Sequence, residues 1–150
     1  MENWPKIDLD TNRDYSMCYG CGKSNPFGLK LNFQWDGKTA RAEFTPGENH
    51  QGWAGYLHGG ITACVLDEAM GWAAMFSGLY NVTAKMQVRY RQIAPVGKTY
   101  LVACTISKHT KRLVETKAIM TGSNGEIFAE GFSTQFVIKT KEDQTRKLEP

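Results

Sequence analysis

The 150-residue sequence has few prolines, few cysteines and little excess charge. Five prolines beside fifteen glycines exclude collagen-like and proline-rich low-complexity chains. A net charge of +3 is too small to predict a nucleic-acid partner. A chain of this length can bury a core without disulfides. The apolar (41%) and charged (22%) fractions are those of an ordinary globular protein, so we expect a single folded domain.

The N-terminal residues contain no basic stretch followed by an apolar run, so no secretion signal is predicted and a cytoplasmic location is expected. Glycines and prolines interrupt residues 1–28 too often for a long helix or strand. We therefore expect an irregular N-terminal segment at 1–28, the folded domain at 29–138 and a charged tail at 139–150.

Alternating apolar and polar residues predict strands on both sides of one apolar segment. Residues 29–34 and 39–44 predict a hairpin, because Asp36-Gly37 between them is a strong turn signal. Four more strands, expected to be consecutive members of an antiparallel sheet, are predicted at 83–91, 100–108, 113–121 and 127–138.

Residues 59–76 predict a helix that is apolar on nearly every side. Asp67 and Glu68 near its middle argue against a membrane span, so other parts of the protein must surround this helix. A curved antiparallel sheet wrapped around one long helix meets this requirement. The predicted fold class is therefore α+β.

The start of this helix is a candidate site. None of the residues just before Gly59 and Gly60 is a standard capping residue, so backbone N–H groups there are expected to lack partners. Two glycines let an external atom approach closely, and the helix dipole favours an anion or a developing oxyanion. A tight junction capped by water or backbone is the alternative.

Asp67 is the second candidate, because a carboxylate within an apolar helix needs a partner, a task or contact with solvent. Partial burial would make it a better base. Asp67 and Glu68 are about 100° apart on the helix and face different sides. Gly59 is eight residues from Asp67, about 12 Å along a helix, so one carbonyl cannot reach both in one chain. A site that uses both predicts a symmetric homodimer.

The segment His58–Ala69 (HGGITACVLDEA) resembles the helix signature of hotdog-fold acyl-CoA thioesterases of the phenylacetate-pathway (PaaI-like) and 4-hydroxybenzoyl-CoA thioesterase superfamily. The similarity continues through Thr83 to Pro95-Val96-Gly97. Upstream, Cys18-Tyr19-Gly20-Cys21-Gly22 is similar to a subgroup with an N-terminal Cys-x-x-Cys-Gly segment. The resemblance implies a hotdog fold, hydrolysis of acyl-CoA to a free acid and CoA, and a homodimer or a dimer of dimers.

The resemblance also implies roles for individual residues. The Gly59 amide would polarise the thioester carbonyl, and the partner's Asp67 would act as general base or nucleophile. The Thr83 hydroxyl would orient the water or the carboxylate, and His58 would lie near the carbonyl and shape the start of the helix. The candidate substrate-binding residues are Gly60, Gln51 as a water-positioning group, and Arg89 and Arg91, which with Lys85 could receive the CoA phosphates.

Three alternatives stay open at this point. The chain could be an acyl-thioester dehydratase or hydratase, or a hotdog protein that binds acyl-CoA without turnover. Lys85, Arg89 and Arg91 could belong to a solvated sheet face. Cys18 and Cys21 have the spacing of half a zinc site or a redox pair, but no second pair follows. Structural thiols are favoured, and no metal or cofactor is expected.

Overall fold

The structure is a computed structural model that describes residues 10–11 and 14–142. Two predicted regions lie partly outside the described residues: the N-terminal segment at 1–9 and 12–13, and the tail at 143–150. The helix α1 spans Gly59–Phe76, and a short 3₁₀ helix at Glu48–His50 precedes it. The strands are β1 (Gln34–Trp35), β2 (Thr39–Phe44), β3 (Leu79–Tyr90), β4 (Tyr100–His109), β5 (Leu113–Thr121) and β6 (Ile127–Thr140).

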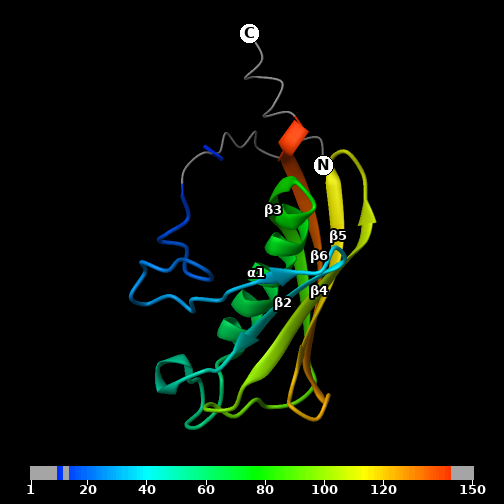
Figure 1. Cartoon of the computed structure of the whole chain (residues 1–150). Helices are drawn as coiled ribbons and strands as arrows, with labels where there is room; N and C mark the ends of the chain where they lie inside the picture. Colours follow the sequence, from blue (N-terminus) through cyan, green and yellow to red (C-terminus); the bar gives the residue numbers. More distant parts are fainter. Residues whose placement is uncertain (1–9, 12–13, 143–150) are drawn as a thin grey trace.

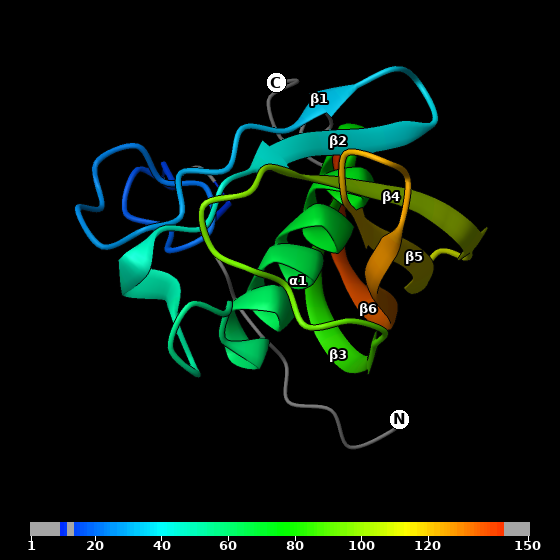
Figure 2. The same ribbon diagram turned by 90° about the horizontal axis from the view of Figure 1, so that it is seen from below.

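The strands form one sheet in the order β1-β2-β4-β5-β6-β3, and every neighbouring pair is antiparallel. The sheet packs along α1 (Figure 1) and, seen from below, curves around it (Figure 2). The predicted architecture is thus confirmed. Within the described part of the chain, no strand pairs with the outer edge of β3.

The predicted order of the last four strands is wrong in one respect, because β3 and β4 are not neighbours. Residues 91–99 do not form a tight turn between them. The Leu57 amide donates to the Ala94 carbonyl at 2.8 Å, and the Val96 amide donates to the Gly55 carbonyl at 3.0 Å. These bonds hold the connection against the loop before α1, and β3 pairs with β6 at the far edge.

The first predicted strand is also shorter than expected. Backbone hydrogen bonds join this part of the chain to the segment between Cys18 and Cys21 instead of to the sheet. The Leu31 amide donates to the Gly20 carbonyl at 2.9 Å. Lys30 has a φ of 54°, which interrupts an extended strand. Leu31 and Phe33 are nevertheless buried in the core, so the apolar pattern predicted burial correctly and pairing incorrectly.

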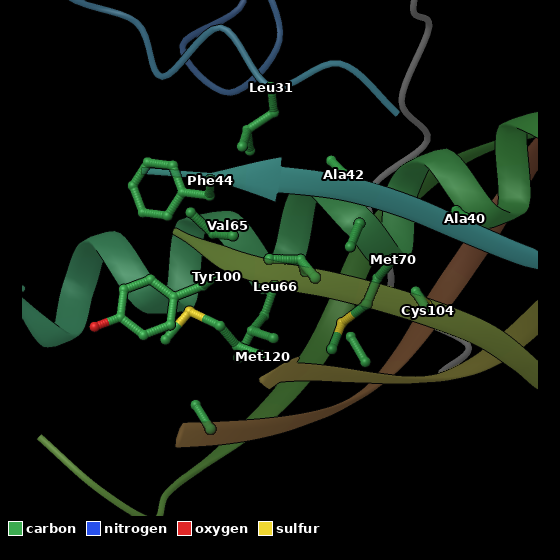
Figure 3. Close-up of a cluster of buried hydrophobic side chains, with 14 of the residues drawn as sticks. Leu31, Ala40, Ala42, Phe44, Val65, Leu66, Met70, Tyr100, Cys104 and Met120 are labelled. Atoms are coloured by element: carbon green, nitrogen blue, oxygen red, sulfur yellow. The ribbon is translucent and has the colours of Figure 1, made fainter. Parts of the chain in front are cut away.

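The core lies between α1 and the concave face of the sheet (Figure 3). Val65, Leu66 and Met70 of α1 are fully buried there, each contributing about 1.5–3 kcal/mol by leaving water. At Gly131 of β6, a Cβ atom would lie 2.4 Å from Cε of Met70, so the glycine lets helix and sheet pack closely. Among the described residues, no helix has the length and apolar character needed to cross a membrane.

Candidate active site

The start of α1 is capped by a side chain, which the sequence did not predict. His58 is the residue before the helix, and its Nδ1 accepts a hydrogen bond from the Gly60 amide at 2.8 Å. An imidazole nitrogen here replaces the usual serine or aspartate oxygen. Because Nδ1 accepts, a neutral ring carries its proton on Nε2, where it can donate. The Gly60 amide is therefore engaged within the chain.

Gly59 keeps its amide available. Among the described residues, no group accepts a hydrogen bond from the Gly59 amide, which belongs to the first helical residue and lies at the positive end of the helix dipole. On the other side of the peptide, the Tyr90 hydroxyl donates to the Gly59 carbonyl at 2.7 Å. Tyr90 was expected only as a strand residue, because nothing in a period-two pattern indicates a contact with a helix terminus.

A cavity of about 820 Å³ opens beside this helix start. His58, Gly59, Tyr90 and Arg91 contribute polar groups to its lining, and the apolar lining includes Trp53, Tyr56, Ile93, Met120 and Phe128. A mainly apolar cleft with a few convergent polar groups is typical of a small-molecule site.

Asp67 lies further along α1, in contact with β3. The Thr83 hydroxyl donates to Oδ1 of Asp67 at 2.7 Å, and Asp67 is half-buried while Thr83 is exposed. Glu68 instead faces the N-terminal segment, where Nε1 of Trp72 donates to its carboxylate at 3.2 Å. The two consecutive carboxylates thus face different sides, as predicted.

One chain does not bring all four predicted catalytic residues together. His58 and Gly59 line the cavity, whereas Asp67 and Thr83 are absent from its lining. Gly59 and Asp67 stand at two points of the same helix, separated by about 12 Å along its axis.

The remaining predicted binding residues occupy different places. The Gln51 amide nitrogen donates to the Glu48 carbonyl at 2.8 Å, and its oxygen accepts from the Gly55 amide, so this side chain holds the loop before α1. Arg91 lines the cavity and pairs with Glu130, with 2.8 Å from Nε to Oε2. Hydrogen bonding to Arg91 lowers the pKa of Glu130.

Arg89 is outside the cavity lining. Its guanidinium lies over the Phe132 ring, with 5.8 Å from Cζ to the centroid. Phe132 belongs to β6, so the Arg89 side chain reaches over the strand next to its own. In the register of the two strands, Arg89 lies on the face of β3 opposite to the residues that contact α1. The structure therefore associates only Arg91 of the two arginines with the cleft.

The position of the His58 ring can be tested at Gly60. An alanine Cβ there would lie 3.0 Å from Nδ1 of His58, so the ring must move and the cap weakens. Losing a cap costs about 1 kcal/mol, and replacing a helical glycine by alanine returns a similar amount. We expect Gly60→Ala to unfold within about 3 °C of the wild type, because the two effects cancel.

Gly71→Ala is the matched control for that variant, because it also adds a methyl group to a helical glycine, with its nearest contact at 3.8 Å from Asn81. Thermal unfolding is measured on both, and Gly71→Ala should unfold at a higher temperature than Gly60→Ala because it loses no cap. An equal rise of the unfolding temperature in the two variants would show that the His58 cap does not stabilise the helix.

Residues 54–129 match the family model described as the Thioesterase superfamily. The chain belongs to the thioesterase superfamily. The matched residues include the start of α1, Asp67, Thr83 and most of the cleft lining. The predicted hotdog fold is the fold of this family and is confirmed.

Similar proteins agree with this assignment. A mouse protein named acyl-coenzyme A thioesterase 13 is 30% identical over 91 residues, which are 59% of this chain and 65% of the mouse protein. The crystal structure of zebrafish thioesterase superfamily member 2 superposes with a TM-score of 0.67 at 26% identity, covering 72% of this chain and 81% of that one.

The Escherichia coli PaaI protein of the phenylacetic acid degradation operon has the same fold as this chain. Its TM-score is 0.71 at 16% identity, over 80% of this chain and 85% of that one.

Proposed function

We propose that the protein hydrolyses acyl-CoA thioesters to a free acid and CoA. The observation that carries this proposal is the unpartnered Gly59 amide, which borders a largely apolar cleft at the positive end of α1. Such an amide suits the oxyanion that forms when a thioester carbonyl is attacked. The name of the mouse relative supports acyl-CoA as the substrate class.

In the proposed reaction the thioester oxygen accepts a hydrogen bond from the Gly59 amide, and Nε2–H of His58, which lines the same cavity, would be a second donor. Water attacks the carbonyl carbon while Asp67 takes its proton. The C–S bond then breaks, and the proton passes to the departing thiolate. Because Thr83 already donates to Oδ1 of Asp67 at 2.7 Å, the second carboxylate oxygen would take the proton from the attacking water.

In the alternative route, Asp67 attacks the carbonyl carbon, the C–S bond breaks and CoA leaves as the thiolate, which gives an acyl-enzyme anhydride. Water then hydrolyses the anhydride to the free acid and the Asp67 carboxylate, and the proton released goes to the thiolate. The same oxyanion donors serve both routes. Thr83 has the same task in each, because its hydrogen bond fixes the rotamer of the carboxylate.

The separation of Gly59 from Asp67 requires a second copy of the chain, and the free edge of β3 is where we place it. Unpaired edge strands pair readily with another chain. Within one chain Thr83 contacts Asp67, and Tyr90 holds Gly59. If the two β3 strands pair antiparallel with Thr83 opposite the partner's Tyr90, Asp67 approaches the partner's Gly59. Because the register shift between Thr83 and Lys85 leaves residue 84 out of the count, the two-fold axis then passes at Gln87, which lies opposite the partner's Gln87.

Exposed apolar side chains support such an assembly. Trp53 is 88% exposed and Ile93 is 72% exposed, and both line the cleft. Large apolar residues gathered at the mouth of a site are typical of surfaces that another chain or a ligand covers. The dimer would complete two equivalent sites.

Hydrolysis fits the site better than dehydration does. A dehydratase of this fold would need a histidine as base, but Nδ1 of His58 is occupied by the Gly60 amide and Nε2 carries the proton. A protein that only binds acyl-CoA would not need a carboxylate held by a hydroxyl, as Asp67 is.

The proposal is tested with a panel of short, long and aromatic acyl-CoAs together with a 3-hydroxyacyl-CoA. Released CoA is measured by chromatography, because the four free cysteines of the chain would consume thiol reagents. We expect release of CoA from at least one class and a dimeric mass in light scattering. Binding of every panel member without release, or water loss from the 3-hydroxyacyl-CoA instead of CoA release, would contradict it.

A further inference from the structure

A second cavity, of about 610 Å³, lies on the other side of α1, and its lining includes the N-terminal segment. Cys18, Cys21 and Glu68 line it together. The two Sγ atoms and a carboxylate oxygen of Glu68 all lie within 4.8 Å of one another, and all three residues are half-buried. The proposed hydrolytic site uses none of them.

Two glycines permit the close approach of these groups. The Gly22 amide donates to the Cys18 carbonyl at 2.8 Å, and a Cβ at Gly22 would lie 2.4–2.6 Å from backbone atoms of Ser16 and Cys18. A Cβ at Gly20 would lie 2.5 Å from the Glu68 carboxylate. The two glycines therefore let the cysteine turn close and let Glu68 approach it.

No described lysine or arginine is paired with this group. Among the described residues, Glu68 forms no ion pair with a lysine or arginine, although it stands half-buried beside two thiols. Its neighbours are the Cys18 thiol at 3.6 Å and Nε1 of Trp72 at 3.2 Å. Burial, and next the hydrogen bond with Glu68, raise the pKa of the Cys21 thiol. A divalent cation would supply the missing charge.

The donor set and spacing suit zinc. Thiolate and carboxylate groups are zinc ligands, and a metal–sulfur distance of about 2.3 Å places the corners of a tetrahedral site about 3.8 Å apart. Small side-chain rotations bring the three atoms to that spacing. The indole N–H on Glu68 is the kind of outer hydrogen bond that orients a metal-bound carboxylate.

Water is the fourth ligand in this arrangement. Cys64 is on α1 one turn before Glu68, but its thiol is not among the atoms that lie within 4.8 Å of one another, and it does not line the cavity. The sequence alone did not connect Cys18 and Cys21 with Glu68, because only the fold brings residues 18–21 to this turn of α1.

We propose that Cys18, Cys21 and Glu68 bind one zinc ion per chain, with water as the fourth ligand. The ion ties the N-terminal segment to the turn of α1 that carries Asp67. Binding releases the thiol protons and involves no oxidation. This departs from the expectation of structural thiols, which weighed the cysteine spacing without Glu68.

The test uses the full reduced chain after chelator treatment, titrated with Zn²⁺ and, separately, with Co²⁺. We expect one ion per chain, a Kd on the order of 10⁻⁸ M for Zn²⁺, and thiolate charge-transfer absorption with Co²⁺. A saturating excess of Zn²⁺ should raise the Tm by about 5 °C or more. These readouts do not depend on thioester hydrolysis.

Cys18→Ser and Glu68→Gln should each weaken Zn²⁺ binding at least about 10-fold. Cys104→Ala is the matched control, because it also leaves three cysteines and removes a buried thiol of the sheet; its affinity should equal that of the wild type. Glu68→Gln keeps both thiols and nearly the same volume, so it tests the site even if Cys18→Ser fails to fold.

Absence of Zn²⁺ binding by the folded wild type would overturn the proposal, as would equal affinities in wild type and Glu68→Gln. A Cys18–Cys21 disulfide in protein purified under reductant would also overturn it. Mass spectrometry would detect this disulfide as a loss of two hydrogens.

Discussion

Asp67→Asn is expected to lower kcat for acyl-CoA hydrolysis by about 10²-fold or more, with little change in KM. Asparagine has nearly the volume of aspartate, and its side-chain oxygen can still accept the hydrogen bond from Thr83. It cannot take a proton from water or attack as a carboxylate. The variant therefore removes the chemistry and keeps the contact, and steady-state rates on the best substrate of the panel measure the loss.

Two further variants make that result specific. Thr83→Val leaves the carboxylate but removes its orienting hydroxyl, so the loss of kcat should be smaller than in Asp67→Asn. Glu43→Gln changes an exposed carboxylate on β2 and should keep wild-type rates. Unchanged turnover in Asp67→Asn would mean that another group activates water, and the assignment of Asp67 would be wrong.

The helix was the most predictable element of the fold. Its observed bounds, Gly59–Phe76, equal the predicted ones, because a run that is apolar apart from Thr62, Asp67 and Glu68 begins at a glycine pair and ends just before Gly78. The hairpin around Gly37, whose φ is 96°, was equally local. The place of β3 beside β6 was not predictable, because it depends on how residues 91–99 dock on the loop before α1.

In the candidate site too, local features could be predicted from the sequence and long-range contacts could not. The separation of Asp67 and Glu68 onto two sides of α1 follows from helix geometry. The contact of Glu68 with Cys18, 50 residues away, depends on where an irregular segment packs, and no periodicity encodes that. The His58 cap was missed because rules for capping residues favour small oxygen-bearing side chains.

Gly59→Pro is expected to abolish most activity while leaving the fold intact. Proline removes the proposed oxyanion donor, and losing one such donor costs about 10²–10³ in kcat. Proline is favoured at the first helical position, and His58 already has the extended backbone, φ −63° and ψ 133°, that a residue before proline requires. Gly59→Ala keeps the amide, with its Cβ 3.5 Å from the Tyr90 ring, and should be far more active.

The two inactive variants together test whether the site is shared between chains. When Asp67→Asn and Gly59→Pro are co-expressed, random pairing makes half of the dimers mixed, and each mixed dimer contains one site with both the amide and the carboxylate. Because one of its two sites is intact, the mixture should recover about a quarter of wild-type activity. Native mass spectrometry measures the mixed fraction. Mixed dimers without recovered activity would place the carboxylate and the amide in the same chain, and the shared site would be wrong.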